Sequence, residues 1–202
     1  MQGQTERILN INKLLFIPLF VFIGFYATSI DRVKNRNPKN NFPKNSSLEV
    51  PYLPRNFVGF KEAVAFKESQ GKYNAVNTLG YLGKYQFGKE TLKRFKIYNT
   101  REFLENPVLQ EKAFAAYCAV NKWILRKDIN RSVGKTIQGI KITESGILAA
   151  AHLGGAGNVK KYLRSHGKIC FSDGYGSTIQ SYLKKFAGYD VSKIKANRKA
   201  SV

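Results

Sequence analysis

Apolar side chains recur at intervals of three and four residues from Phe57 to Phe66, which is the spacing of one face of an α-helix. The repeat fades near Glu68, and Gly71 follows as a residue that commonly ends a helix. The pattern therefore predicts a helix from Phe57 to about Glu68, with Glu68 in its last turn.

A different pattern occupies Tyr73 to Phe87. This stretch is rich in aromatic residues and glycine and has no helical period, which is typical of short strands joined by turns. We expect two or three such strands, forming a small β-hairpin after the first helix.

Beyond Gly88 the apolar positions return to helical spacing, and the helices carry start or stop signals. The predicted helices are a short one at Thr91–Phe95, a long one opened by Asn106-Pro107 and reaching Ile124, one capped by Thr143 and stopped by Gly154-Gly155, one from Asn158 to Gly167, and a last one begun by Ser177 or Thr178 and closed by Gly188. The tail from Ser192 to Val202 lacks this spacing, so we expect it to be frayed. Residues 56–190 are thus predicted to form a mainly α (α+β) domain, followed by a basic tail at 191–202.

The first 55 residues differ from this domain in hydropathy and composition. Leu14 to Ala27 is an uncharged apolar run preceded by basic residues, and it fits a signal-peptide core better than a span of about 20 residues. We interpret residues 1–30 as a signal peptide or signal anchor rather than a buried core helix, because the run is apolar on every face. Residues 31–55 are expected to be a disordered basic linker. Export is therefore expected, to the periplasm or the extracellular space, or with an anchor in the inner membrane.

The chain is strongly basic. Its 202 residues include 34 Lys and Arg against 13 Asp and Glu, a net charge of +21, of which +17 falls on residues 51–202. Such a surplus points to a polyanionic partner: nucleic acid, anionic lipid or cell-wall polymer. With two Cys, two His and no metal-ligand spacing, we expect neither a metal nor another cofactor. Cys118 and Cys170 could pair after export if their geometry allows.

Glu68 is a candidate general acid. No other acid lies between Glu68 and Glu90, and a carboxylate in the last turn of a helix meets the negative end of the macrodipole, which disfavours its charged form. Nearby aromatic residues such as Tyr73 and Tyr85 would desolvate it further if the hairpin folded over it. A carboxylic acid that keeps its proton is what general acid catalysis needs. On spacing alone, a solvated surface glutamate is the commoner interpretation.

The surroundings of Glu68 carry a motif. Glu68-Ser69, Gly80, Gly83, Gln86 and Thr91 stand at the spacing Glu-Ser, then Gly-x-x-Gly-x-x-Gln, then a Thr five residues on. This arrangement resembles the catalytic motif of the soluble lytic transglycosylases and goose-type lysozymes. The run from Ala150 to Val159 resembles the second motif of that family, and Tyr182 is similar to its closing tyrosine. The resemblance covers about residues 57–187 and implies a lysozyme-like helical fold.

The resemblance also implies roles for individual residues. Glu68 would be the catalytic acid and base, and the substrate-binding residues would be Ser69, Gly83, Tyr85, Gln86, His152, Gly155 and Tyr182. Gly83 would let a saccharide approach the backbone, or would be no more than a turn glycine. The chain departs from the family at His152-Leu153, where the family has Tyr-Asn, and at Gly88-Lys89, where it has Met-Pro. His152 either takes over a polar role or packs under the Gly154-Gly155 turn.

The family's reaction needs one acid and no metal or cofactor. The resemblance implies that Glu68 protonates the glycosidic oxygen between N-acetylmuramic acid and N-acetylglucosamine in peptidoglycan, and then deprotonates the C6 hydroxyl to close a 1,6-anhydro ring. Ordinary glycosidases use two carboxylates, and the predicted hairpin holds no second acid. A hydrolytic muramidase would recruit Glu90, Glu144 or Asp173.

Peptidoglycan glycan strands are therefore the expected partner of this basic, exported domain. Two other functions stay open. One is a non-catalytic peptidoglycan-binding module of the same fold, whose altered second motif has lost turnover. The other is a nucleic-acid binder, against which stand the export segment and the absence of a recognition-helix, OB or RNP pattern.

Overall fold

The computed structural model describes residues 54–202. The predicted signal peptide or anchor, and all of the predicted linker except Pro54 and Arg55, lie outside the described residues. Within residues 54–202, no helix combines the length and the apolar character that crossing a bilayer requires. The helices and strands of this part are α1 (Phe57–Ser69), α2 (Lys89–Arg94), α3 (Thr100–Glu105), α4 (Pro107–Ser132), β1 (Thr136–Ile137), β2 (Ile140–Lys141), α5 (Glu144–Arg164) and α6 (Ile179–Lys185).

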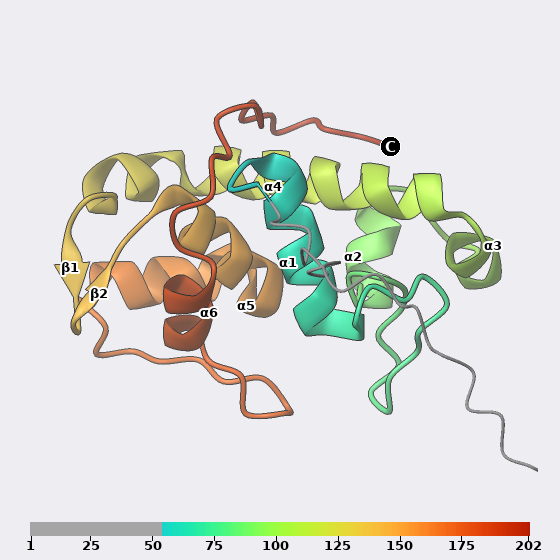
Figure 1. Cartoon of the computed structure of the whole chain (residues 1–202), viewed down its shortest axis with the longest axis horizontal. Helices are drawn as coiled ribbons and strands as arrows, with labels where there is room; N and C mark the ends of the chain where they lie inside the picture. Colours follow the sequence, from blue (N-terminus) through green and yellow to red (C-terminus); the bar gives the residue numbers. More distant parts are fainter. Residues whose placement is uncertain (1–53) are drawn as a thin grey trace, which may run out of the picture. The chain divides into compact units, whose positions relative to one another are not determined.

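The predicted mainly α class is confirmed (Figure 1). The core is built around α5, in which every side chain from Ile147 to Ala151 is fully buried. This helix packs against the long helix α4 and against α6. Because all its faces are covered, its sequence is apolar throughout this stretch instead of showing a single apolar stripe.

The helix starts that the sequence predicts are confirmed by their caps. The side chain of Asn106 accepts a hydrogen bond from the backbone N–H of Leu109, with Pro107 as the first helical residue of α4. Thr143 caps α5 in the same way. Thr178, not Ser177, caps α6, and its side chain and that of Ser181 form a reciprocal capping box.

The predicted hairpin at 73–87 is wrong in detail. This segment is a loop held by isolated bridges between Val76 and Leu82 and between Leu82 and Phe87, and it contains no regular strand. Left-handed backbone at Gly83 and Gln86 interrupts any ladder. The antiparallel pair β1–β2 lies instead at 136–141, where a two-residue turn with positive φ at both positions joins the strands.

The predicted stop at Gly154-Gly155 appears as a break within α5, because Gly155 is non-helical and two helical segments meet there. α5 continues to Arg164 across a kink at Gly155, whose φ of 76° and ψ of 155° are accessible to glycine. Asn158 does not begin a new helix: its side-chain amide donates to the carbonyl of Gly154 at 3.0 Å, so it satisfies a backbone group beside the kink.

The C-terminal tail is packed, in contrast to the frayed tail expected. Ile194 is buried, and the backbone N–H of Asn197 donates to the carbonyl of Ala119 in α4 at 3.1 Å. The guanidinium groups of Arg126 and Arg198 lie 4.2 and 5.2 Å from the ring centroid of Trp123. These tertiary contacts hold the tail without any helical pattern in its own sequence.

Candidate functional site

Four segments that are distant in sequence line one small pocket of about 80 Å³. They are the end of α1, the loop between α1 and α2, the middle of α5 and the loop before α6. The lining residues are Glu68, Asn77, Leu79, Tyr81, Gln86, His152, Leu153, Asp173, Gly174 and Tyr175. Three of the predicted site residues therefore line this pocket: Glu68 of α1, Gln86 of the loop and His152 of α5.

Tyr182 reaches Glu68 from α6. Its phenolic hydroxyl donates a hydrogen bond to Oε1 of Glu68 at 2.6 Å. Tyr182 is almost completely buried, and burial, together with the charge and the hydrogen bond of Glu68, raises the pKa of the phenol well above its usual 10. The hydroxyl therefore keeps its proton at neutral pH and stays a donor, which fixes the orientation of a half-buried carboxyl group.

His152 combines both interpretations that the sequence left open. Its Nε2 lies 2.7 Å from the carbonyl oxygen of Tyr85, so this nitrogen carries the proton and donates it. The rings of Phe87, Phe114 and Tyr117 surround the imidazole edge-on. Its Nδ1 is buried with no hydrogen-bond partner, while the residue lines the pocket. The histidine is thus packed among aromatic rings, not under the Gly154-Gly155 turn, and has one acceptor left over.

Gln86 lies at the pocket in a left-handed backbone conformation, with φ of 50°. Its amide Nε2 donates to the carbonyl of Gly83 at 2.9 Å. This bond closes a tight turn and directs the residue toward the cavity that holds Glu68. The sequence motif identified Gln86, but its unusual backbone conformation gave no signal in the sequence.

Gly83 and Tyr85 do not line the pocket and are held in the surrounding framework, so their contact with substrate stays a prediction. A Cβ at position 83 would lie 2.8 Å from Cδ of Gln110 and closer still to its Oε1, so packing against Gln110 requires a glycine here. Tyr85 is fully buried, its ring stacks on Phe114 at 4.0 Å, and its hydroxyl donates to Glu111.

Ser69 and Gly155 also lie outside the pocket lining. The hydroxyl of Ser69 donates to the carbonyl of Lys84 at 2.8 Å, which ties the end of α1 to the loop that carries Gln86. Gly155 provides the kink in α5, three residues beyond His152. Both residues position the site without contacting the cavity.

A partly buried ionic network around Glu111 of α4 supports the loop, and no sequence pattern predicted it. Its carboxylate accepts hydrogen bonds from Lys61, Lys84, Tyr73 and Tyr85. Burial by itself would raise the pKa of Glu111, but these donors outweigh it and lower the pKa from 4.5 to about 2. Burial likewise opposes the charge of Lys84, yet its bonds to Glu111 and Glu62 raise its pKa above the usual 10.5. Tyr73 and Tyr85, which the sequence predicted to desolvate Glu68, therefore donate hydrogen bonds to Glu111 instead.

This network predicts how stability depends on pH. An unfolded chain protonates Glu111 near pH 4.5, while the folded state keeps it ionised to about pH 2, so the unfolded state binds more protons within this window. Its stabilisation is therefore present above pH 4.5 and lost as the pH falls toward 2. Urea titrations at about pH 5 and about pH 2.5 measure the free energy of unfolding. Between these pH values it should fall by roughly 2 kcal/mol less in Glu111→Gln than in wild type, after allowance for partial exposure. Equal losses in both proteins would contradict the prediction.

Asp173 is the one acid among the three candidates for a second carboxylate that shares the pocket with Glu68. Its Oδ1 accepts hydrogen bonds from the backbone N–H groups of Tyr175 at 3.0 Å and Ser177 at 2.7 Å. Glu90 is exposed and pairs with Lys93, and Glu144 pairs with Lys122. Neither of these two lines the Glu68 pocket.

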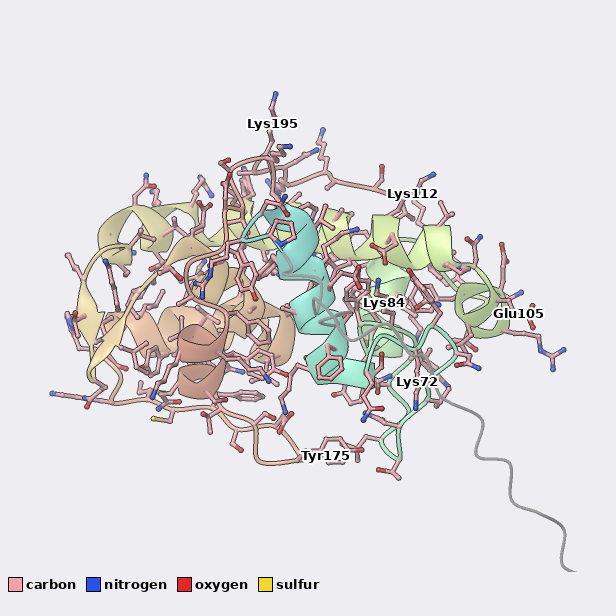
Figure 2. The ribbon with its side chains drawn as sticks, viewed as in Figure 1. Lys72, Lys84, Glu105, Lys112, Tyr175 and Lys195 are labelled. Carbon is pink, nitrogen blue, oxygen red and sulfur yellow. The ribbon has the colours of Figure 1, made fainter. Side chains whose placement is uncertain are left out.

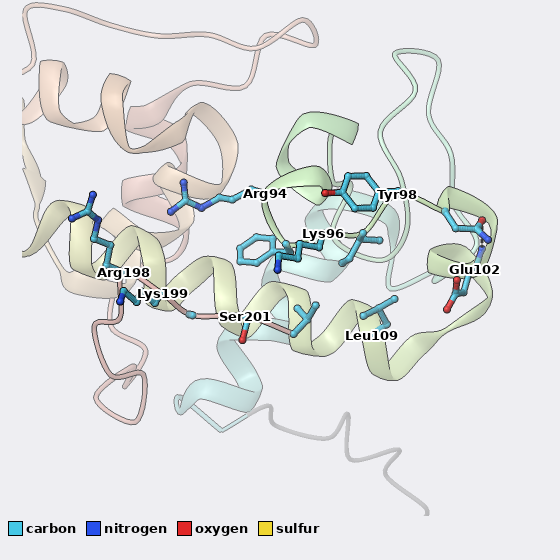
Figure 3. A pocket seen from close by; sticks show the side chains of 13 residues that line it. Arg94, Lys96, Tyr98, Glu102, Leu109, Arg198, Lys199 and Ser201 are labelled. Atoms are coloured by element: carbon cyan, nitrogen blue, oxygen red, sulfur yellow. Dashed lines mark hydrogen bonds between the residues drawn. The ribbon is translucent and has the colours of Figure 1, made fainter.

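A larger hollow of about 890 Å³ lies elsewhere, between the α2–α3 region and the C-terminal tail (Figure 3). Arg94, Lys96, Arg198 and Lys199 make it basic, and Glu102 is the acidic side chain on its wall. None of the predicted site residues lines it. Size alone favours this hollow, but the pocket of Glu68 has an acid with a fixed hydrogen-bond donor and a histidine on its wall, which makes it the candidate functional site.

Cys118 is buried, Cys170 is exposed, and both are free thiols. Within residues 54–202, no group of three or more His, Cys, Asp or Glu side chains is arranged to hold a metal ion. No protein-family model, no curated protein and no solved structure matches the chain.

Proposed function

We propose that this protein cleaves the β-1,4 linkage between N-acetylmuramic acid and N-acetylglucosamine in peptidoglycan, as a lytic transglycosylase with a lysozyme-like fold. Glu68 is its single acid and base. The proposal includes the predicted export, which would place a domain of charge +17 beside an anionic wall polymer.

The hydrogen bond between Tyr182 and Glu68 carries this proposal. It joins the first and last parts of the sequence resemblance across 114 positions of the chain. Gln86 from the first motif and His152 from the second line the same cavity. Nothing in the local pattern of the chain requires these residues to meet, so their convergence on Glu68 and its pocket supports a common role.

The reaction proceeds in two proton transfers at Glu68. The carboxylic acid gives its proton to the glycosidic oxygen as the bond from that oxygen to C1 breaks, and the acetamido group of the sugar stabilises the cationic centre. The C6 oxygen then bonds to C1 while its proton returns to the Glu68 carboxylate, so no water is consumed. Tyr182 holds the carboxyl group throughout, which is a positioning role.

His152 offers a substitute for the amide that the second motif lacks. Among the described residues its buried Nδ1 has no hydrogen-bond partner, and the residue lines the cavity; an N-acetyl group presents an N–H donor. Pairing the two would satisfy a buried nitrogen that otherwise has no hydrogen-bond partner. His152 is thus the proposed substrate-binding residue in place of the family's asparagine.

The full chain incubated with purified peptidoglycan tests this function. Mass spectrometry of the released muropeptides should show anhydro ends, which are one water lighter than hydrolytic ends. Release of no muropeptides at all would overturn the enzymatic proposal.

Hydrolysis is the second candidate, and the position of Asp173 favours it. A second carboxylate in the pocket of Glu68 could activate a water molecule. Ends that carry a full water, with ¹⁸O incorporated from labelled water, would identify the protein as a muramidase and assign Asp173 the role of base.

A further inference from the structure

Two loops meet above the pocket of Glu68. The hydroxyls of Thr78, in the loop after α1, and Tyr175, in the loop before α6, lie 2.6 Å apart and form a hydrogen bond. Figure 2 shows the side chain of Tyr175 extending between the two loops. Beside it, Leu79 covers Gly174 so closely that a Cβ on Gly174 would lie 3.0 Å from Cδ1 of Leu79. We call these two contacts the clasp.

The space beneath the clasp is too small for a sugar. The pocket holds about 80 Å³, whereas sites for small organic ligands usually offer about 300–1,000 Å³. Leu79, Gly174 and Tyr175 line this same pocket, so the clasp residues are part of its wall.

The clasp is made of contacts that can separate easily. Thr78, Leu79 and Tyr175 are exposed, so their hydroxyls and apolar surface can turn to water when the loops part. Each loop also holds a glycine with positive φ and open space around it, Gly80 in one and Gly176 in the other. By contrast, the floor of the pocket, with Glu68, Tyr182 and His152, is fixed by hydrogen bonds to buried groups.

We propose that the clasp has to open before a glycan strand can reach Glu68, which makes Thr78, Leu79, Gly174 and Tyr175 the residues that control substrate entry. Once released, the ring and hydroxyl of Tyr175 lie at the mouth of the site, where a flat aromatic face can stack on a sugar. The role as an entry for glycan rests on the function proposed above. The clasp itself is a property of the two loops.

A disulfide across the clasp tests the proposal directly. Position 174 has no positive φ and its Cβ would lie close to the side chain of residue 79, so Leu79→Cys with Gly174→Cys is within reach of a disulfide. Cys170 is exchanged for Ser in the full chain, because it is exposed and would compete as a thiol. The oxidised protein should release muropeptides at least about tenfold more slowly than the same protein after reduction. The two single-cysteine variants should not respond to reductant.

Hydrogen exchange separates failure of the clasp from failure of the proposed function. In the full chain without substrate, amides in residues 76–82 and 171–178 should exchange several-fold faster in Tyr175→Phe than in wild type, while those of α5 stay unchanged. If wild type releases no muropeptides, the proposed function fails, and the hydrogen-exchange result alone tests whether the clasp holds the two loops together. Unchanged exchange in Tyr175→Phe, or full activity of the oxidised double-cysteine protein, would overturn it.

Discussion

Replacing Glu68 with Gln is expected to reduce muropeptide release by about 10²–10⁴-fold, the usual contribution of a general acid and base. Glutamine accepts the hydrogen bond from Tyr182 that the carboxyl group now accepts at 2.6 Å, so the fold should survive the change. It has no proton to give to a glycosidic oxygen and cannot receive one from C6. The assay is release of soluble muropeptides by the full chain, with thermal unfolding measured in parallel.

Glu90→Gln is the matched control for this variant. Glu90 is an exposed acid paired with Lys93 outside the pocket, so its removal should leave the rate within about twofold of wild type. Sedimentation with insoluble peptidoglycan adds a second measurement. If Glu68→Gln still binds the polymer but does not cleave it, the enzyme is supported. If wild type binds and releases nothing, the non-catalytic wall-binding module is the better account. A fully active Glu68→Gln would exclude this residue as the acid.

Gly83→Ala is expected to destabilise the fold by roughly 3 kcal/mol or more, because it combines backbone strain with a clash in a closely packed core. Its φ of 77° suits glycine, and a Cβ would strike the side-chain amide of Gln110. That amide is fully buried and bonds to the backbone of Lys84, Tyr73 and Phe103, so it cannot move aside without losing these partners. Urea unfolding of the full chain measures the loss.

Gly80→Ala separates the two causes. Gly80 has nearly the same φ, 79°, but no atom lies near the position of its Cβ, so this variant should cost only about 1 kcal/mol of backbone strain. The difference between the two variants is the cost of the clash with Gln110. Equal losses would mean that Gly83 is required for its backbone conformation alone. A stable but inactive Gly83→Ala would restore the interpretation that a saccharide approaches this backbone.

The sequence predicted the features that neighbouring residues decide. Caps at Asn106, Thr143 and Thr178 fix where helices begin, because each side chain bonds a backbone N–H two or three positions away. The sequence pattern predicted the structure less well where contacts between distant residues determine it. The tail is held by contacts with α4, among them the stacking of Arg198 on Trp123, while the predicted stop at Gly154-Gly155 appears as a break at Gly155 after which a second helical segment continues to Arg164.

The candidate site shows the same division. The family resemblance identified Gln86 in the first motif, His152 in the second and Tyr182 as the closing tyrosine, and the structure brings all three to Glu68 or to its pocket. Ser69, Gly83 and Tyr85 carry the same resemblance in sequence but support the pocket from outside. Glu111 was missed altogether, since a glutamate in a helical stretch gives no sign that two lysines and two tyrosines will converge on it.

The hydroxyl that holds Glu68 belongs to the last helix of the domain. During synthesis, α1 leaves the ribosome long before α6, and for most of that time the acid has no partner to orient it. Translation must pass residue 182 before a competent centre can exist, and a product cut short before that point would carry the motif without the means to use it. The proposed lytic activity would in this way depend on synthesis of the chain through α6.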